Sequence, residues 1–434
     1  MRAYDIILKK RNGEKLTKEE IEYMVMGYVK GEIPDYQMSA FLMAIYFQHL
    51  DEEETYFFTE AMMRSGEILD LSSIPGSKID KHSTGGVGDK TTLVVAPLVA
   101  SCGVVVAKMS GRALGHTGGT IDKLESIPGF RTSLSFEEFI EIVKIHGIAI
   151  VGQTADLVPA DKKIYALRDA TATVDEISLI ASSIMSKKLA GGSDAFVLDV
   201  KFGSGAFMKS KEKARELGKM MVNIGKLHNK KTIAILSSMQ QPLGKMVGNS
   251  LEVVEAIETL KGNGPKDLTE LSLCLASYML YLAGISDLEG VKKILKDKIE
   301  SGEALEKFRE MVEAQGGDGR IIEDYSLLPI SKNIVEVLSD REGIVEKIDT
   351  EKIGIASMVL GAGRKKKEDK VDHSVGVEVL KKLGDKVSKG EPLVKLYCSS
   401  KSDVETARNL IKSAYIISEQ PPKQEFKLIH EVIE

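Results

Sequence analysis

From about Ser77 onward, apolar runs of strand length alternate with stretches of helical length, and no other feature limits the folds of this chain as strongly. Strands that alternate with helices usually form a parallel sheet whose faces the helices cover. The expected strands are residues 104–108, 149–151, 195–200 and 232–236. The expected helices are residues 94–101, 136–145 and 211–227. The middle of the chain is therefore predicted to form a mixed α/β domain.

The residues before this region are predicted to be helical. Thr17 and Glu20 form a capping-box pattern ahead of apolar residues at helical spacing. Two more helices are expected at residues 36–48 and 52–64. Gly31 is expected to end the first of these helices, which fits a bundle of short helices.

A later helix interrupts the α/β pattern. Its predicted start is a second capping box, formed by Thr173 and Glu176. We expect this helix to pack with the N-terminal helices, which makes the helical domain discontinuous in sequence.

The C-terminal part has short strands separated by turns, which predicts a small β-rich α+β domain. Residues 383–393 resemble the turn of lipoyl-type hammerhead domains, but no lysine nearby has a lipoyl-like context, so we interpret the turn as structural. The charge run at residues 364–370 is expected to be a solvated loop. The predicted domains are residues 1–70 plus about 160–192 (helical), 75–155 plus 193–335 (α/β, phosphate-binding) and 340–434 (α+β, hammerhead-like).

Composition excludes several classes of protein. The net charge is −5 and no domain-length segment is strongly basic, so nucleic acid is not an expected partner. The N-terminus has no apolar signal region, and no apolar run is long enough to cross a bilayer, so no membrane is expected. Three widely separated cysteines fit reduced thiols in a reducing compartment, and a cytoplasmic location is predicted.

The first candidate site is a glycine-rich loop, residues 81–92, which lies just before an apolar helical run. Glycines let the backbone approach an anion, and amides at a helix N-terminus favour negative charge. Lys81 adds a cation, and Ser83 and Thr92 add hydroxyl donors. The spacing matches neither a P-loop nor a dinucleotide fingerprint, so the loop predicts an anion site of another kind.

The second candidate site follows the strand expected at residues 104–108. Its loop contains Lys108, Ser110 and Thr120 among several glycines, the same combination of cation and hydroxyls. Ligands of α/β sheets bind beyond the carboxyl ends of the strands, where this loop lies. Together the two loops predict one phosphate held by both.

The third candidate site is the interrupting helix and the residue that leads into it. Ser183 and Lys187 are four residues apart and share a helix face, Ile180 lies one turn earlier, and Arg168 precedes the helix. A hydroxyl, a cation and an apolar side chain together can bind the edge of a planar heterocycle. His82, inside the first loop, is the preferred proton donor or hydrogen-bond partner near pH 7.

These motifs resemble those of pyrimidine-nucleoside phosphorylases and the related thymidine phosphorylases. The resemblance covers essentially the whole chain and is carried by three long motifs: KHSTGGVGD at residues 81–89, SGRALGHTGGTIDKLESIPG at residues 110–129 and SIMSKKLAGG at residues 183–192. It implies a homodimer that associates through the helical domain. It also implies cleavage of pyrimidine nucleosides by inorganic phosphate, the co-substrate, to a free base and α-D-(deoxy)ribose 1-phosphate in pyrimidine salvage, without an organic cofactor.

The resemblance also implies roles for individual residues. The implied phosphate ligands are Lys81, Ser83, Thr92, Lys108, Ser110 and Thr120. The residues implied to bind the pyrimidine are Arg168, Ser183, Lys187, Leu114, Ile180 and Phe207, and the implied catalytic residues are His82, Arg168 and Lys187. The lysine at position 108 resembles the branch of the family that accepts uridine as well as thymidine. The thymidine-restricted branch tends to have methionine at this position.

Some relatives bind a potassium ion, and this adds a further expectation. The matching positions are Gly88, Lys90, Leu243, Met246 and Glu255. A lysine at position 90 is an awkward neighbour for a cation if its side chain points inward, whereas a backbone carbonyl ligand does not depend on the side chain. The sequence leaves occupancy of this site open.

Three alternatives remain at this stage. The first is a thymidine-restricted phosphorylase. The second is an enzyme like anthranilate phosphoribosyltransferase, which would need acidic residues close together to hold magnesium and pyrophosphate, and none stand out near the loops. The third is a non-catalytic nucleoside sensor, which would not need the full set of cations and hydroxyls.

Overall fold

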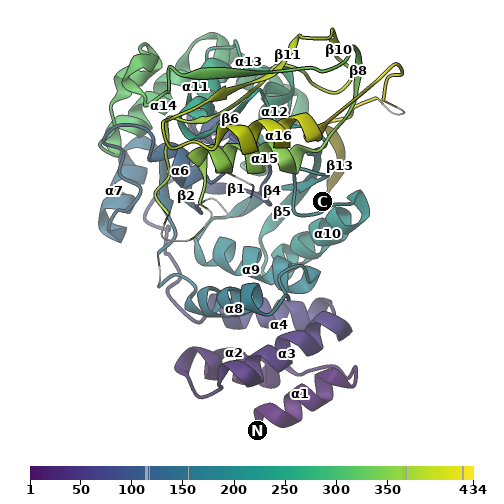
Figure 1. Ribbon diagram of the computed structural model, residues 1–434. Helices are drawn as coiled ribbons and strands as arrows, with labels where there is room; N and C mark the ends of the chain where they lie inside the picture. The colour runs from purple at the N-terminus through teal and green to yellow at the C-terminus, as the bar shows by residue number, and fades with distance from the viewer. Residues whose placement is uncertain (113–115, 117, 155, 365, 367–368, 423–424) are drawn as a thin grey trace.

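The computed structural model is an elongated molecule with the N-terminal helices at one end and the C-terminal β-rich part at the other (Figure 1). It describes residues 1–112, 116, 118–154, 156–364, 366, 369–422 and 425–434. The central sheet lies between these ends. No helix within these ranges combines the length and apolar composition needed to cross a membrane.

The N-terminal helices are α1 (Ala3–Arg11), α2 (Lys18–Lys30), α3 (Asp35–Gln48) and α4 (Glu52–Met63). Three of them, α2, α3 and α4, were expected from the sequence, and α1 was not. The capping box of Thr17 and Glu20 is confirmed at the start of α2, and Asp51 and Glu54 form another at α4. Two later helices, α8 (Pro159–Ala170) and α9 (Ile177–Ala190), pack on this bundle through α2, α3 and α4.

The predicted capping box at Thr173 is wrong, because α9 begins only at Ile177. Glu176 is itself the N-cap residue, and its Oε2 accepts a hydrogen bond from the Leu179 N–H at 2.7 Å. The guanidinium of Arg168 binds the carbonyls of Thr173 (3.2 Å) and Val174 (2.6 Å). These bonds hold the segment before Glu176 outside the helix.

The central sheet is largely parallel, as predicted. Its strand order is β1 (Ile79–Ser83), β4 (Ala195–Phe202), β5 (Lys231–Ser238), β13 (Ile429–Ile433). The first three strands are parallel, whereas β13 pairs antiparallel with β5. A separate parallel pair is β2 (Val106–Ser110) with β3 (Ile148–Gly152). The Val105 N–H donates to the Ser77 carbonyl and the Ile79 N–H donates to the Val105 carbonyl, which connects this pair to the start of β1.

Helices cover this sheet region. They are α5 (Thr91–Ala100), α6 (Thr120–Leu124), α7 (Phe136–His146), α10 (Lys211–Leu227), α11 (Asn249–Leu260), α12 (Lys266–Leu282), α13 (Leu288–Glu300) and α14 (Glu303–Ala314). Every residue of α5 is buried, among α11, α12 and α14. Because α5 is fixed on all sides, the glycine-rich loop that leads into it has a rigid support.

The C-terminal part contains two small sheets. The first has the order β6 (Met246–Gly248), β9 (Gly376–Val379), β11 (Pro392–Tyr397), β7 (Ile334–Leu338). The second has the order β10 (Lys386–Val387), β8 (Gly343–Ile348), β12 (Tyr415–Ser418). The helices are α15 (Thr350–Ser357) and α16 (Val404–Ala414), with short turns of helix at Gly319–Ile322, Tyr325–Leu327 and Met358–Ala362. The short strands expected in the C-terminal part are confirmed, and β13 leaves this part to join the central sheet.

The charge run expected to be solvated begins with an anchored residue instead. Arg364 Nη1 lies 2.8 Å from Oδ1 of Asp122, a fully buried carboxylate on α6. Residues 365, 367 and 368 lie outside the described residues. A buried carboxylate without a counter-charge is strongly unfavourable, and the Arg364 guanidinium, whose side chain keeps 21% of its surface exposed, supplies such a charge.

Candidate active site

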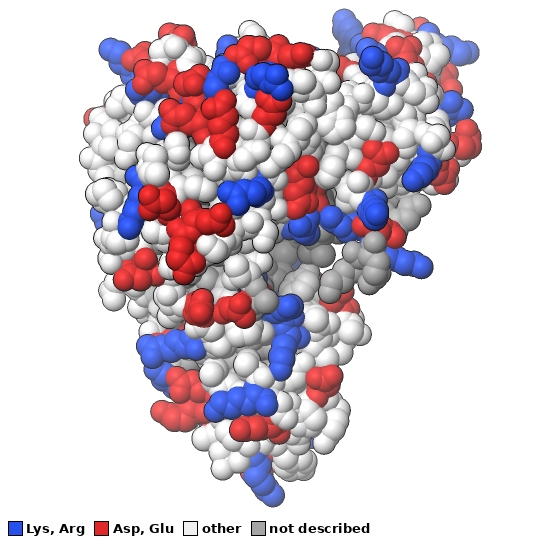
Figure 2. Space-filling model, turned by 90° about the vertical axis from the view of Figure 1, so that its left-hand side faces the viewer, with Lys and Arg blue, Asp and Glu red and all other residues white. Residues whose placement is uncertain are grey.

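A cleft of about 1160 Å³ lies where the ends of β1 and β2 face α8 and α9. Figure 2 shows the surface hollowed between the wide part that carries the sheets and the narrow helical end. The predicted site residues that line the cleft are His82, Ser83, Thr92, Lys108, Ser110, Thr120, Arg168, Ile180, Ser183, Lys187 and Phe207. Leu114 lies outside the described residues. The three motifs, far apart in sequence, therefore meet in one cavity.

The first loop leaves β1 and turns back into α5. Gly85 and Gly88 have φ angles of 89° and 75°, which residues with a side chain rarely adopt. Ser83 Oγ donates to Asp89 Oδ2 at 2.5 Å and accepts from the Gly85 N–H at 3.1 Å. Ser83 is thus held by its own loop, and its hydroxyl proton must turn away from Asp89 to reach a phosphate.

Lys81 does not line the cleft and lies beneath the loop instead. Its ammonium donates to Thr91 Oγ1 at 2.6 Å and lies 4.0 Å from Asp199 Oδ2. Lys201, which the sequence analysis did not single out, lies 2.8 Å from the same carboxylate. Burial lowers the pKa of Lys81. In this structure Lys81 therefore influences the cleft through its charge and through Thr91.

Asp80 links two lysines that converge on the cleft. Its Oδ1 accepts from Lys108 at 3.2 Å and its Oδ2 accepts from Lys188 at 2.6 Å. Burial favours the neutral acid, but these two ammonium groups outweigh it and lower the pKa of Asp80 to about 2. The sequence analysis missed Asp80 and Lys188, and it also missed the strand β1 that places Asp80.

The same surroundings weaken the charge of Lys108. Burial, reinforced by the nearby ammonium groups of Lys188 and Lys81, lowers the pKa of Lys108 to about 7 despite the attraction of Asp80. Near neutral pH the side chain is therefore poised between its charged and neutral forms. A bound anion would favour the charged form.

His82 is protonated less readily than an ordinary histidine. Burial, together with the charges of Lys188 and Lys108, lowers the pKa of His82 well below 6.5. The imidazole is therefore neutral near pH 7 and offers one N–H donor and one acceptor nitrogen. Of the two roles predicted for His82, this environment favours the hydrogen-bond partner over the charged proton donor.

The opposite wall of the cleft carries the residues predicted to bind the base. Lys187 Nζ donates to Asp161 Oδ2 and, at 2.9 Å, to Ser183 Oγ. Asp161, on α8, was not singled out from the sequence. The Lys187 side chain keeps 19% of its surface exposed, so its ammonium is positioned but still accessible to a ligand.

Arg168 also lines the cleft but is strongly tied to the backbone. Besides the two carbonyls before α9, it donates to the Leu179 carbonyl at 3.1 Å. Three of its five N–H donors are used in this way. Burial lowers the pKa of Arg168 from its usual very high value. The guanidinium therefore shapes the turn between α8 and α9, and these three bonds leave two of its N–H groups unused.

The apolar residues complete the cleft. Ile180 lies one turn before Ser183 on α9. Phe207 is 39% exposed, and its ring centroid lies 5.8 Å from that of His116. An exposed aromatic ring at the edge of a cleft provides a flat apolar surface for a planar ligand.

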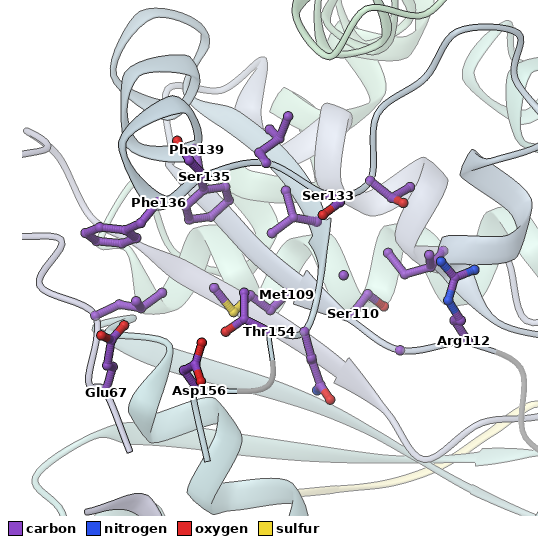
Figure 3. A pocket seen from close by; sticks show the side chains of 18 residues that line it. Glu67, Met109, Ser110, Arg112, Ser133, Ser135, Phe136, Phe139, Thr154 and Asp156 are labelled. Carbon is purple, nitrogen blue, oxygen red and sulfur yellow. The ribbon is translucent and has the colours of Figure 1, made fainter. Parts of the chain in front are cut away.

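A second, smaller hollow of about 560 Å³ adjoins the cleft (Figure 3). Its lining includes Met109, Ser110 and Arg112 from the end of β2 and Ser135 and Phe136 from the start of α7. Arg112 Nη2 donates to Glu125 Oε1 at 2.7 Å, which anchors the second loop on the far side of Ser110. The end of β2 therefore forms a partition between the two hollows.

The predicted potassium positions are brought together, but they surround the Lys90 side chain. Lys90 Nζ donates to the Leu243 carbonyl (3.0 Å), the Met246 carbonyl (2.7 Å) and Glu255 Oε2 (2.5 Å). Gly88 lies against the same Leu243 carbonyl. Oxygen ligands of this kind suit a potassium ion, but an ammonium already occupies the space between them, so the residues present do not fit a bound ion.

Comparisons with known proteins identify the parts of the chain. Residues 76–305 match the model described as "Glycosyl transferase family, a/b domain". Residues 4–66 match the "Glycosyl transferase family, helical bundle domain", and residues 344–418 match the "Pyrimidine nucleoside phosphorylase C-terminal domain". The predicted fold class, helical plus α/β plus α+β, is confirmed.

Full-length relatives carry a consistent name. The pyrimidine-nucleoside phosphorylase of Geobacillus stearothermophilus is 55% identical over 97% of both chains. That of Bacillus subtilis (strain 168) is 54% identical over all of both chains. The crystal structure of anthranilate phosphoribosyltransferase from Thermus thermophilus covers 72% of this chain and 99% of its own, with a TM-score of 0.57 and 20% identity. This last likeness shows a shared fold alone.

Proposed function

This chain belongs to the pyrimidine-nucleoside phosphorylase family, a group of pentosyltransferases, and we propose that it cleaves uridine, deoxyuridine and thymidine. The family reaction is the phosphorolysis of pyrimidine nucleosides, with inorganic phosphate as co-substrate. The proposed products are the free base and α-D-(deoxy)ribose 1-phosphate. The observation that carries the proposal is the single cleft that joins both glycine-rich loops to the cationic face of α9.

In the proposed mechanism, phosphate binds between the two loops and attacks C1′ from the face opposite the base. Lys108, Ser110 and Thr120 supply one cation and two hydroxyl donors from the second loop, and Ser83 and Thr92 supply hydroxyls from the first. Lys108 becomes fully charged when the anion arrives. These contacts orient the phosphate, and its oxygen remains free to attack C1′.

The second part of the proposed mechanism is the stabilisation of the departing base. The C1′–N1 bond breaks through an oxocarbenium-like state, and the bonding electrons leave with the pyrimidine as an anion. Lys187 places positive charge at the base, the remaining donors of Arg168 add to it, and neutral His82 donates a hydrogen bond to a carbonyl oxygen. Donors positioned where charge develops each contribute about 3–4 kcal/mol to such reactions.

Lys108 supports the broader substrate range over a thymidine-restricted enzyme. Lys108 lies on β2 and is one of the residues that line the cleft. A charged donor there can bind the 2′-hydroxyl that distinguishes uridine from deoxynucleosides. Methionine, which the resemblance associates with the restricted branch, could not make that bond.

Domain closure is part of the proposal, because the loops and the base-binding residues lie on different elements. Helices α8 and α9 pack on the N-terminal bundle, whereas the loops extend from β1 and β2. The Lys188–Asp80 ion pair of 2.6 Å joins the two sides and limits how far they can separate. A crosslink that fixes an open form should abolish turnover, and full activity of the crosslinked enzyme would contradict closure.

We also propose a homodimer in the cytoplasm. Tyr36 and Phe47 on α3 are 75% and 70% exposed, and an exposed aromatic surface supports association through the helical domain. Sedimentation velocity should give the mass of a dimer, and replacing Phe47 with aspartate should weaken it. A monomer at micromolar concentration would contradict this part.

One assay tests the proposed reaction. The purified enzyme is incubated with uridine or thymidine, with and without phosphate, and base and sugar phosphate are quantified. We expect base release from both nucleosides only with phosphate, and one sugar 1-phosphate for each base. Release in phosphate-free buffer would indicate hydrolysis, and activity on thymidine alone would indicate the restricted alternative.

A further inference from the structure

Lys90 places a positive charge where the first loop meets the rest of the molecule. Its side chain has no exposed surface, and all three ammonium protons have acceptors: two backbone carbonyls and one carboxylate. Lysine is seldom buried unless its charge is fully compensated. An environment that satisfies every proton indicates a built site for one monovalent cation.

Charge is balanced around this ammonium. Lys123, also buried, lies 3.0 Å from Glu252 Oε2 and donates to the Asp89 carbonyl at 2.7 Å. Glu252 Oε2 also lies 4.0 Å from Lys90. Two lysines therefore face two glutamates, Glu252 and Glu255. A free cation added to this group would leave an uncompensated buried charge, which is strongly unfavourable.

Space is equally limited. A methyl group at Gly88 would lie 2.6 Å from the Leu243 carbonyl oxygen. A methyl group at Gly244 would lie 3.0 Å from Lys90 Nζ and even closer to Glu255. The backbone has closed around the ammonium, and the oxygens that would replace the water shell of an ion are already its acceptors.

The contacts connect three elements. Lys90 is the residue just before α5, so it ends the first loop. Met246 begins β6, which pairs with β9 of the C-terminal part, and Glu255 lies on α11. The ammonium therefore fixes the loop that contains Ser83 against β6 and α11.

We propose that the Lys90 ammonium is a covalently attached replacement for a bound monovalent metal ion, and that it makes the first loop independent of potassium. The oxygens of Leu243, Met246 and Glu255 bind this ammonium in place of the ion. Lys90 is a positioning residue: it touches no substrate and acts through the loop that carries Ser83 and Thr92. The melting test below is independent of the proposed reaction, and only the kinetic test depends on it.

The wild-type enzyme provides the first test. Thermal unfolding is followed in potassium, sodium and tetramethylammonium chloride at equal ionic strength. We expect the same melting temperature in all three salts. A saturable increase with potassium alone would overturn the proposal, as would rubidium density between Leu243, Met246 and Glu255 in soaked crystals.

Two variants of Lys90 that differ in side-chain volume provide the second test. Lys90→Ala removes the charge and leaves a hole lined by oxygens, whereas Lys90→Met removes the charge but keeps the volume. We expect Lys90→Ala to melt several degrees lower and to recover in a saturable way with potassium or ammonium, but not with tetramethylammonium. Lys90→Met should melt lower without recovery, because its side chain blocks the site.

Kinetics separates positioning from general stability. In Lys90→Ala without potassium, KM for phosphate should rise about tenfold with a smaller change in kcat, and potassium should restore KM. The control is Lys245→Ala, whose exposed side chain lies two residues after Leu243, and it should behave as wild type in every salt. A Lys90→Ala enzyme with wild-type melting and KM in potassium-free buffer would contradict the proposal. If Lys90→Ala does not fold, the wild-type salt series and rubidium soak decide alone.

Discussion

The two walls of the cleft hold their cations in different ways. On the phosphate wall, formed by β1, β2 and their loops, the lysines are buried and paired with buried aspartates. On the base wall, formed by α8 and α9, Lys187 remains partly exposed and Arg168 binds backbone carbonyls. The lysines of the phosphate wall are therefore fixed before substrate arrives, whereas on the base wall Arg168 is fixed and Lys187 keeps an ammonium that can adjust to a ligand. Predictions that separate the two walls test this difference.

The largest effect is expected on the base wall. Lys187→Ala should lower kcat/KM by about 10²–10³, because it removes a charged donor from the departing base. Phosphate binding, measured by calorimetry, should remain nearly unchanged. The control is Lys162→Ala at the exposed edge of the cleft, which should retain most activity. Wild-type kinetics of Lys187→Ala would refute its assigned role.

A slightly smaller effect is expected on the phosphate wall, and it should appear in stability. Asp80→Asn leaves the ammonium groups of Lys108 and Lys188 without their shared carboxylate, which should reduce the free energy of unfolding by about 3 kcal/mol. Urea denaturation measures this loss. Asp297→Asn, an exposed aspartate on α13, is the matched control and should change stability by less than about 0.5 kcal/mol. Equal stability of the two variants would show that the Asp80 network is not needed for the fold.

Lys108→Met should have an intermediate effect on binding. Loss of one charged hydrogen-bond donor costs about 1.5–3 kcal/mol, so KM for phosphate should rise at least about tenfold. Activity on uridine should fall more than activity on thymidine. If the ratio of the activities on uridine and thymidine is the same as in the wild type, Lys108 does not determine the substrate range.

The smallest effect is a pH dependence of anion binding. The pKa of Lys108 is about 7 in the folded protein, below its value in the unfolded chain. Above pH 7 the folded protein therefore holds fewer protons than the unfolded chain, and the free energy of unfolding increases with pH until the unfolded chain also loses this proton. A bound dianion raises the pKa, so binding should take up less than one proton per site at pH 8. Calorimetry with sulfate in two buffers of different ionisation enthalpy measures this uptake. Lys108→Met should show none, and equal uptake in both proteins would assign the proton elsewhere.

The sequence predicts the parts of the site that depend on local patterns. The first loop leads into a helix and the second follows a strand, both as predicted, because glycines and hydroxyls next to an apolar run are a local signal. Asp80 and Lys188 were missed because their pairing joins residues 108 positions apart. The false capping box at Thr173 has the same origin, since Arg168 competes for the backbone carbonyls that a helix would use. The inward direction of Lys90 likewise depends on carbonyls more than 150 residues away.

The antiparallel pairing of β13 with β5 has a consequence for biosynthesis. Strand β5 is complete at Ser238, but its outer edge pairs with β13, residues 429–433, near the C-terminal end of the sequence. While the ribosome makes the intervening segment, this edge presents unpaired amides and carbonyls, the kind of surface that recruits strands from other nascent chains. Slow translation or a truncated message should therefore yield aggregated product, and chaperones that shield strand edges should raise the yield of intact enzyme.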